Sequence, residues 1–180
     1  MIPPPADPPK AEAVPPSASC GLKTALALFM GFFALYVHSA APGLAPYRDT
    51  GEMVVSASTL GISHPPSYPL YILMGRIFEN LPLAEPAYRL SLLSCAAGAA
   101  AVALMFLVAS GKGRGVGPRV GPEVKLTALI AALALGLNRS FWSVTTVPEM
   151  YSLGILLAIF LLYLAEGPAN FPLPARGEAP

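Results

Sequence analysis

Two long stretches without a charged residue limit the possible folds of this chain most strongly. Residues 24–41 form an uncharged run of 18 residues, and residues 90–110 form a second one of 21 residues. As α-helices these runs would measure about 27 and 32 Å, close to the roughly 30 Å thickness of a bilayer's hydrocarbon core. Only 12% of all residues are charged, against about 25% in a soluble domain. We therefore predict an all-α integral membrane protein.

Two shorter apolar runs, 126–138 and 150–165, bring the predicted number of transmembrane helices to about four. The more polar segment 139–149 separates these two runs, so we interpret the pair as a helical hairpin. Either interfacial residues extend its arms, or one arm is broken partway where the backbone faces protein or a water-lined cavity. A cleaved signal peptide is the competing interpretation of 24–41. It is disfavoured because the run is longer than a typical apolar signal region and Pro42 suits cleavage poorly.

Proline marks the ends of the membrane region. Residues 1–19 contain seven prolines and no aromatic residue, a composition that predicts a disordered tail. Residues 20–166 form the predicted transmembrane region, and 167–180 return to proline and charge as a loose C-terminal tail.

The loop charges predict an orientation in the membrane. The connector 111–125 carries four basic residues and one acidic residue, so the positive-inside rule places it in the cytoplasm together with both termini. Segments 42–89 and 139–149 then lie outside. The first has too many charges for another crossing, and 50–60 and 66–78 within it are predicted interfacial helices. The compact chain, without a sorting signal, favours the bacterial inner membrane.

Charge, cysteine and histidine content exclude several classes of function. The net charge is +1, so no bulk field would attract nucleic acid. The two cysteines predict neither a disulfide framework nor a zinc site, since Cys95 lies inside an uncharged run. No second histidine stands at ligand spacing from His64, and His38 belongs to the first span. We therefore predict no metal ligands and no cofactor, although the pattern leaves a divalent metal open.

Acidic residues directly after the first span are the main candidates for chemistry. Asp49 and Glu52 follow Arg48 at the predicted membrane boundary. A carboxylate at such a boundary can act as a general base, because desolvation raises its proton affinity. The alternative is structural, since Asp49 as N-cap and Glu52 three residues later imitate a capping box. Spacing alone favours the cap.

His64 begins a His-Pro-Pro-Ser-Tyr element that ends at Tyr68. Pro65 and Pro66 restrict His64 to an extended conformation and stiffen the peptide that presents its imidazole. Such rigid placement suits a binding site. The alternative, a turn with a solvated histidine before a surface helix, is locally the better interpretation.

The second outer loop adds four candidates. Trp142 and Tyr151 fit an aromatic belt. Glu149 lies at the mouth of an apolar helix, as either a functional acid or a partner of the helix dipole. Arg139 either binds an anionic head group or extends its long side chain so that the guanidinium reaches the membrane–water interface. The predicted orientation places all these candidates on one side of the membrane, where they can form a single polar site for an anionic amphiphile.

These motifs in this order resemble a family of multi-spanning membrane proteins that is similar to the protein O-mannosyltransferases of the GT-C glycosyltransferase superfamily. The resemblance covers residues 24–164 and is carried by Arg48-Asp49-Thr50-Gly51-Glu52, the segment 60–71 around His64-Pro65-Pro66, Phe141-Trp142-Ser143, and Glu149-Met150-Tyr151. It corresponds to the N-terminal part of such enzymes, which carry an acidic pair in the first outer loop. The fold that it implies is a partial GT-C-like core.

The resemblance implies transfer of a sugar from a polyprenyl-phosphate donor to an acceptor hydroxyl, for example of protein Ser or Thr, on the outer or luminal face. Asp49 would deprotonate the acceptor, and Glu52 would support it. The remaining candidates would contact donor or acceptor: Arg48, His64, Tyr68, Arg139, Trp142, Glu149 and Tyr151.

GT-C enzymes have about twice as many spans as the four predicted here. A missing C-terminal half or a partner subunit is therefore expected. The alternative function is a non-enzymatic multi-pass protein, such as a transporter subunit or assembly factor, in which the outer carboxylates are caps and belt residues.

Overall fold

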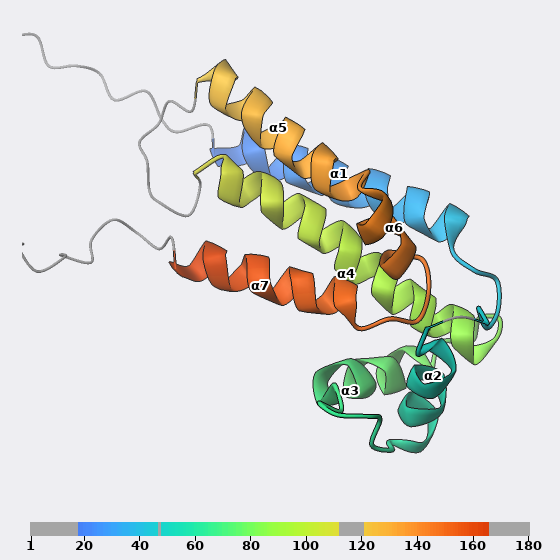
Figure 1. The fold of residues 1–180 in the computed structure, drawn as a ribbon. Helices are drawn as coiled ribbons and strands as arrows, with labels where there is room; N and C mark the ends of the chain where they lie inside the picture. The colour runs from blue at the N-terminus through green and yellow to red at the C-terminus, as the bar shows by residue number, and fades with distance from the viewer. Residues whose placement is uncertain (1–17, 47, 112–120, 166–180) are drawn as a thin grey trace, which may run out of the picture.

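The computed structural model describes residues 18–46, 48–111 and 121–165, and within these ranges every regular element is a helix. Residues 1–17 of the predicted N-terminal tail, the predicted C-terminal tail and most of the predicted basic connector lie outside the described residues. The predicted tail ends two residues too late, because residues 18 and 19 belong to the first helix. This described part of the chain forms seven successive helices (Figure 1): α1 Ala18–Ser39, α2 Thr50–Thr59, α3 Pro69–Phe78, α4 Pro86–Ala109, α5 Pro122–Gly136, α6 Arg139–Thr145 and α7 Tyr151–Ala165. The predicted all-α class is confirmed.

Helices α1 and α4 are long and apolar enough to cross a membrane. Helices α5 and α6 pass the same test as a pair, although they are bent by 60° at the break between them. The Asn138 side chain explains the bend, because its Oδ1 accepts hydrogen bonds from the backbone N–H groups of Ser140 and Phe141 and starts a new helix. The described residues therefore contain two candidate spans, or three with the bent pair. Helix α7 has 15 residues, fewer than a full crossing needs, so the fourth span stays a prediction.

Helix α4 is the centre of the bundle. It packs against α1, α5 and α7, and Figure 1 shows it running between these helices. Small residues between 97 and 101 on α4 are buried and allow this close approach. The predicted hairpin of the last two apolar segments is corrected here, because α5 and α7 each pack chiefly against α4.

The apolar core has two parts. The larger part fills the bundle and includes Phe32, Tyr36, Val102 and Phe106. The smaller part joins α2 and α3 to one end of α4 through residues such as Met53, Tyr71 and Leu90. We call residues 50–78, which contain α2 and α3, the outer lobe, after the side of the membrane predicted for them. Its two helices match the interfacial helices predicted for the first outer loop.

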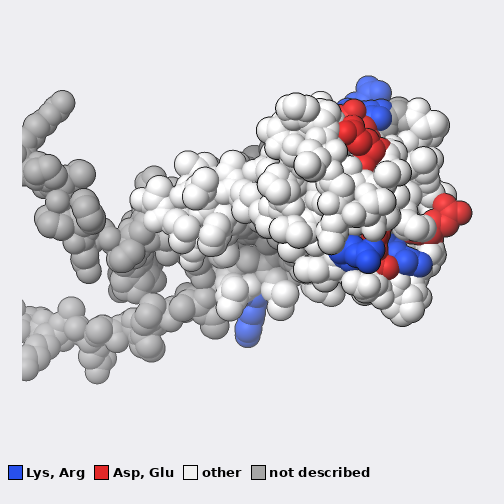
Figure 2. Space-filling view, turned by 90° about the horizontal axis from the view of Figure 1, so that it is seen from below, with Lys and Arg blue, Asp and Glu red and all other residues white. Residues whose placement is uncertain are grey.

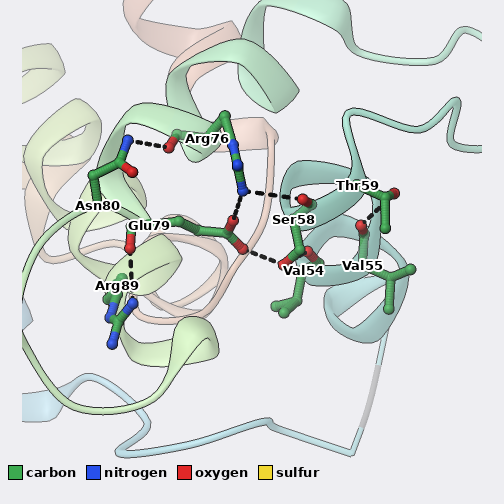
Figure 3. A network of polar contacts seen from close by, with 8 residues as sticks. All are labelled: Val54, Val55, Ser58, Thr59, Arg76, Glu79, Asn80 and Arg89. Atoms are coloured by element: carbon green, nitrogen blue, oxygen red, sulfur yellow. Dashed lines mark hydrogen bonds and ion pairs between the residues drawn. The ribbon is translucent and has the colours of Figure 1, made fainter.

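A polar network fixes the outer lobe (Figure 3). The Glu79 carboxylate accepts a hydrogen bond from Ser58 Oγ of α2 and lies 3.3 Å from Arg76 Nη1. Arg76 also donates to the Ser58 carbonyl at 3.0 Å. Arg89 of α4 donates to the Glu79 carbonyl at 2.7 Å. The lobe is thus attached to the bundle, and the first residues of α2 have a defined position.

Charged side chains are unevenly distributed. On the face drawn in Figure 2 most of them gather at the end that holds the outer lobe, and much of the remaining described surface is uncharged. This distribution suits a bundle in lipid with one polar end. The loop after α6 meets the segment after α1, since Ala41 N–H donates to the Thr146 carbonyl at 3.1 Å. Segments 42–89 and 139–149 therefore lie together, as predicted.

Candidate active site

The site begins at the first turn of α2. Asp49 occupies the N-cap position, but its side chain makes no capping hydrogen bond. The Glu52 carboxylate turns away from the helix start and binds His64. The capping-box alternative therefore fails in the structure, although it was the better interpretation of the spacing. Both carboxylates face the His-Pro-Pro element.

His64 is held at two points by one carboxylate. Its backbone N–H donates to Glu52 Oε1 at 2.5 Å, and its ring Nδ1 lies 2.7 Å from Glu52 Oε2. The other ring nitrogen, Nε2, lies 3.8 Å from Asp49 Oδ2. Tyr68 packs edge-on against the imidazole, with 5.5 Å between the ring centroids. His64 is therefore fixed between two acids, and the alternative of a merely solvated histidine fails.

The contact between Glu52 and His64 changes both proton affinities. The ring hydrogen bond from His64, together with that from its backbone N–H, holds the pKa of Glu52 below its usual value. The same contact raises the pKa of His64 against the opposing effect of burial. Both shifts favour the ionised pair. The side chains of Asp49, Glu52 and His64 remain about two-fifths exposed, so a substrate can reach them.

Glu149 is the buried acid of the site. It is fully buried, and neither carboxylate oxygen has a hydrogen-bond partner within the described chain. Burial raises the pKa of this carboxyl. The backbone N–H of Asp49 counteracts that effect, and the Asp49 charge reinforces it. The Asp49 backbone N–H and the Glu149 carboxylate are therefore close to each other, although they do not meet the geometry of a hydrogen bond.

The position of Glu149 depends on two residues that the sequence analysis missed. Ser94 Oγ of α4 donates to the Glu149 carbonyl at 3.0 Å and lies 3.2 Å from the Glu149 backbone nitrogen. The Tyr71 hydroxyl of α3 lies 3.1 Å from the same Ser94 oxygen. A serine inside an otherwise apolar span is the signal that could have revealed this link, because polar groups there normally bind another element.

Arg48 and Tyr151 line a cleft beside this cluster. The cleft has a volume of about 450 Å³, and its walls come mainly from apolar residues of α5, α6 and α7. Arg48 Nη2 also lies 3.4 Å from Ser143 Oγ of α6, which brings the first outer loop to the second. The lining residues are Arg48, Ala134, Leu135, Asn138, Ser140, Phe141, Val144, Tyr151 and Ile155. One guanidinium thus stands at an otherwise mostly apolar cleft.

The two remaining candidates lie elsewhere. Arg139 is exposed at the start of α6, and its side chain makes no hydrogen bond or ion pair within the described residues. Trp142 packs edge-on against Tyr36 of α1, with 5.0 Å between ring centroids, and is half-buried against the bundle core. The structure therefore brings together Arg48, Asp49, Glu52, His64, Tyr68, Glu149 and Tyr151.

The fold and the site define a class: an all-α membrane protein with an acid and histidine cluster at one polar end of its bundle. Residues 49–167 match the family described as "Protein O-mannosyl-transferase TMEM260 N-terminal domain". This match covers well over half of the chain, so the chain belongs to that family, and the predicted family resemblance is confirmed.

Two relatives carry the same name. The chain is 31% identical to the mouse "Protein O-mannosyl-transferase TMEM260" over 150 residues, which are 83% of this chain and 20% of the mouse protein. It is 30% identical over 83 residues to the Dictyostelium discoideum "Protein O-mannosyl-transferase tmem260", covering 44% of this chain and 10% of that one. The chain thus spans about a fifth of the mouse relative's length. No solved structure matches it.

Proposed function

We propose that this chain is the acceptor-activating part of a membrane glycosyltransferase that moves a sugar from a polyprenyl-phosphate donor to a hydroxyl of an acceptor protein. The observation that carries the proposal is that Asp49 and Glu52 do not cap helix α2. Their carboxylates face His64 instead of the helix start. Two relatives named as protein O-mannosyl-transferases support a sugar and a protein acceptor.

In this proposal Asp49 accepts the proton of the acceptor Ser or Thr hydroxyl. The acceptor oxygen forms a bond to the anomeric carbon, the bond between that carbon and the phosphate oxygen breaks, and polyprenyl phosphate leaves. A single displacement inverts the anomeric configuration. Glu52 fixes His64, and His64 faces Asp49 at 3.8 Å, so these two residues orient the base.

The cleft beside Arg48 fits the proposed donor. A polyprenyl chain needs an apolar surface that opens toward lipid, and its phosphate needs a cation at the end of that surface. Helices α5, α6 and α7 supply the apolar surface, and Arg48 supplies the cation. Arg139, which charge alone suggested as a phosphate ligand, does not line this cleft.

The proposed orientation places the site on the outer or luminal face and the N terminus in the cytoplasm. The loop charges support it, although most of the basic connector lies outside the described residues. The bacterial inner membrane stays a prediction from the sequence, as does a partner subunit that completes the enzyme.

The test is Asp49→Asn, introduced at the native locus so that any partner subunit is retained. We expect transfer from polyprenyl-phosphate sugar to a Ser/Thr peptide to fall by about 10²- to 10⁴-fold, the usual contribution of a general base. Membrane insertion should be unchanged. Glu123→Gln, at the start of α5, is the control carboxylate. Unchanged transfer by Asp49→Asn would remove Asp49 from the mechanism.

A further inference from the structure

We propose that His64 and Asp49 are ligands of a divalent transition-metal ion, with Glu52 orienting the histidine and the buried Glu149 carboxylate adding negative charge beside the site. This inference goes beyond the transfer reaction proposed above and does not depend on it. Asp49, Glu52 and His64 come from two segments, and they offer ligand atoms within 4.8 Å of one another. No second histidine stands at ligand spacing from His64, so the sequence by itself predicts no such site.

The geometry of the two ligand atoms fits one ion. His64 Nε2 and Asp49 Oδ2 lie 3.8 Å apart. Nitrogen and carboxylate ligands bind Zn²⁺ at about 2.0 to 2.2 Å, so two ligands of one ion stand at most about 4.4 Å apart. The observed separation falls below this limit and is too long for a hydrogen bond. An ion can therefore lie between these atoms with little movement of either side chain.

Glu52 has the position of an outer-sphere carboxylate. A metal-binding histidine normally donates its second ring N–H to a carboxylate, which fixes the tautomer and the ring orientation. Glu52 Oε2 lies 2.7 Å from His64 Nδ1, and Glu52 Oε1 also accepts the His64 backbone N–H. When a metal ion displaces the Nε2 proton and Nδ1 keeps its own, the lone pair of Nε2 points toward Asp49. The histidine is thus already oriented for a metal.

Glu149 is the independent observation that points to a cation. Its carboxylate is fully buried, and both oxygens are without a hydrogen-bond partner in the described part of the chain. The proximity of the Asp49 backbone N–H places it beside the cluster. A buried carboxylate without a partner is costly and normally signals an ion or a water molecule. A cation between Asp49 and His64 would provide the missing charge.

The donor set indicates which cations would bind. Imidazole suits Zn²⁺ and related transition metals, and carboxylates suit Mn²⁺, so the mixed set predicts Mn²⁺ or Zn²⁺ rather than an ion with only oxygen ligands. A cation there would lower the pKa of a hydroxyl bound to it, which would assist the deprotonation assigned to Asp49.

The experiment measures metal binding directly on the purified full chain in nanodiscs, after removal of bound metal with a chelator. Mn²⁺ is titrated, and free Mn²⁺ is followed by electron paramagnetic resonance. We expect one saturable site per chain, displacement of Mn²⁺ by Zn²⁺, and no displacement by an equal concentration of Mg²⁺. Spin-echo modulation should report one imidazole nitrogen coupled to Mn²⁺.

Variants assign the site. His64→Ala and Asp49→Asn should each weaken Mn²⁺ binding at least tenfold, and His64→Ala should remove the nitrogen coupling. Glu52→Gln should weaken binding by about 10- to 100-fold, as expected for an outer-sphere partner. His38→Ala, the other histidine of the chain, is the matched control and should bind normally. Circular dichroism of each variant establishes that it is folded.

Two results would overturn the proposal: absence of a saturable Mn²⁺ or Zn²⁺ site below about 1 mM in the folded wild-type chain, or unchanged binding by both His64→Ala and Asp49→Asn. Neither result would bear on the transfer reaction, because that reaction is measured separately with Asp49→Asn.

Discussion

The Glu52 carboxylate holds His64 by its backbone and by its ring at the same time, with distances of 2.5 Å and 2.7 Å. One side chain from the first turn of α2 thereby fixes the loop that leads to α3. The contact turns the second imidazole nitrogen toward Asp49. The arrangement of the site therefore depends on Glu52 more than on any helix cap.

Removal of the Glu52 charge should disturb this arrangement without unfolding the bundle. In Glu52→Gln the amide can accept only one of the two hydrogen bonds, so His64 loses its fixed orientation. We expect transfer activity to fall by about tenfold or more, measured with the same donor and peptide as for Asp49→Asn. Glu123→Gln should retain full activity. Equal activity of Glu52→Gln and wild type would contradict the positioning role of Glu52.

The two arginines should differ in their effect on donor binding. Arg48 lines the cleft beside α6 and α7, whereas Arg139 is exposed at the start of α6. Arg48→Ala should weaken binding of a polyprenyl phosphate by about tenfold, because it removes a charge-assisted contact. Arg139→Ala should bind almost as wild type. Fluorescence quenching with a labelled polyprenyl phosphate measures both, and the reverse order would assign the phosphate to Arg139.

A bulky residue inside the cleft should exclude the lipid chain. Ile155 of α7 lines the cleft, and Leu157, two residues later, is exposed. Ile155→Trp should fill part of the 450 Å³ volume and reduce donor affinity by about tenfold or more. Leu157→Trp adds the same side chain on another side of the helix and should leave affinity unchanged. Tight donor binding by Ile155→Trp would show that the lipid binds elsewhere.

Close packing of α4 and α6 should make Gly98 intolerant of a side chain. A Cβ atom at Gly98 would lie 2.2 Å from Thr145 Cγ2, so Thr145 or the helix backbone must move. Gly98→Ala should destabilise the bundle by about 1 to 3 kcal/mol, the usual cost of overpacking. Gly31→Ala is the matched control in α1, because nothing lies within 4 Å of its added Cβ. Thermal unfolding in detergent compares the two, and equal midpoints would place Gly98 outside a close contact.

The sequence by itself determined the membrane helices and the outer lobe. Their signals are local, since apolar length defines a span and the charges of 42–89 exclude another crossing. Helix α2 ends one residue before its predicted end, and α3 begins three residues after its predicted start. The break between α5 and α6 was left as one of two alternatives, and the Asn138 cap decided it.

Only the tertiary structure decided what Asp49, Glu52 and His64 do. Spacing favoured a capping box, because a local pattern cannot represent a partner 12 residues away such as His64. The link from Ser94 to Glu149 joins residues 55 positions apart and has no periodic signal. Helix propensity and hydropathy are properties of neighbouring residues, whereas a site of this kind is assembled by packing between distant segments.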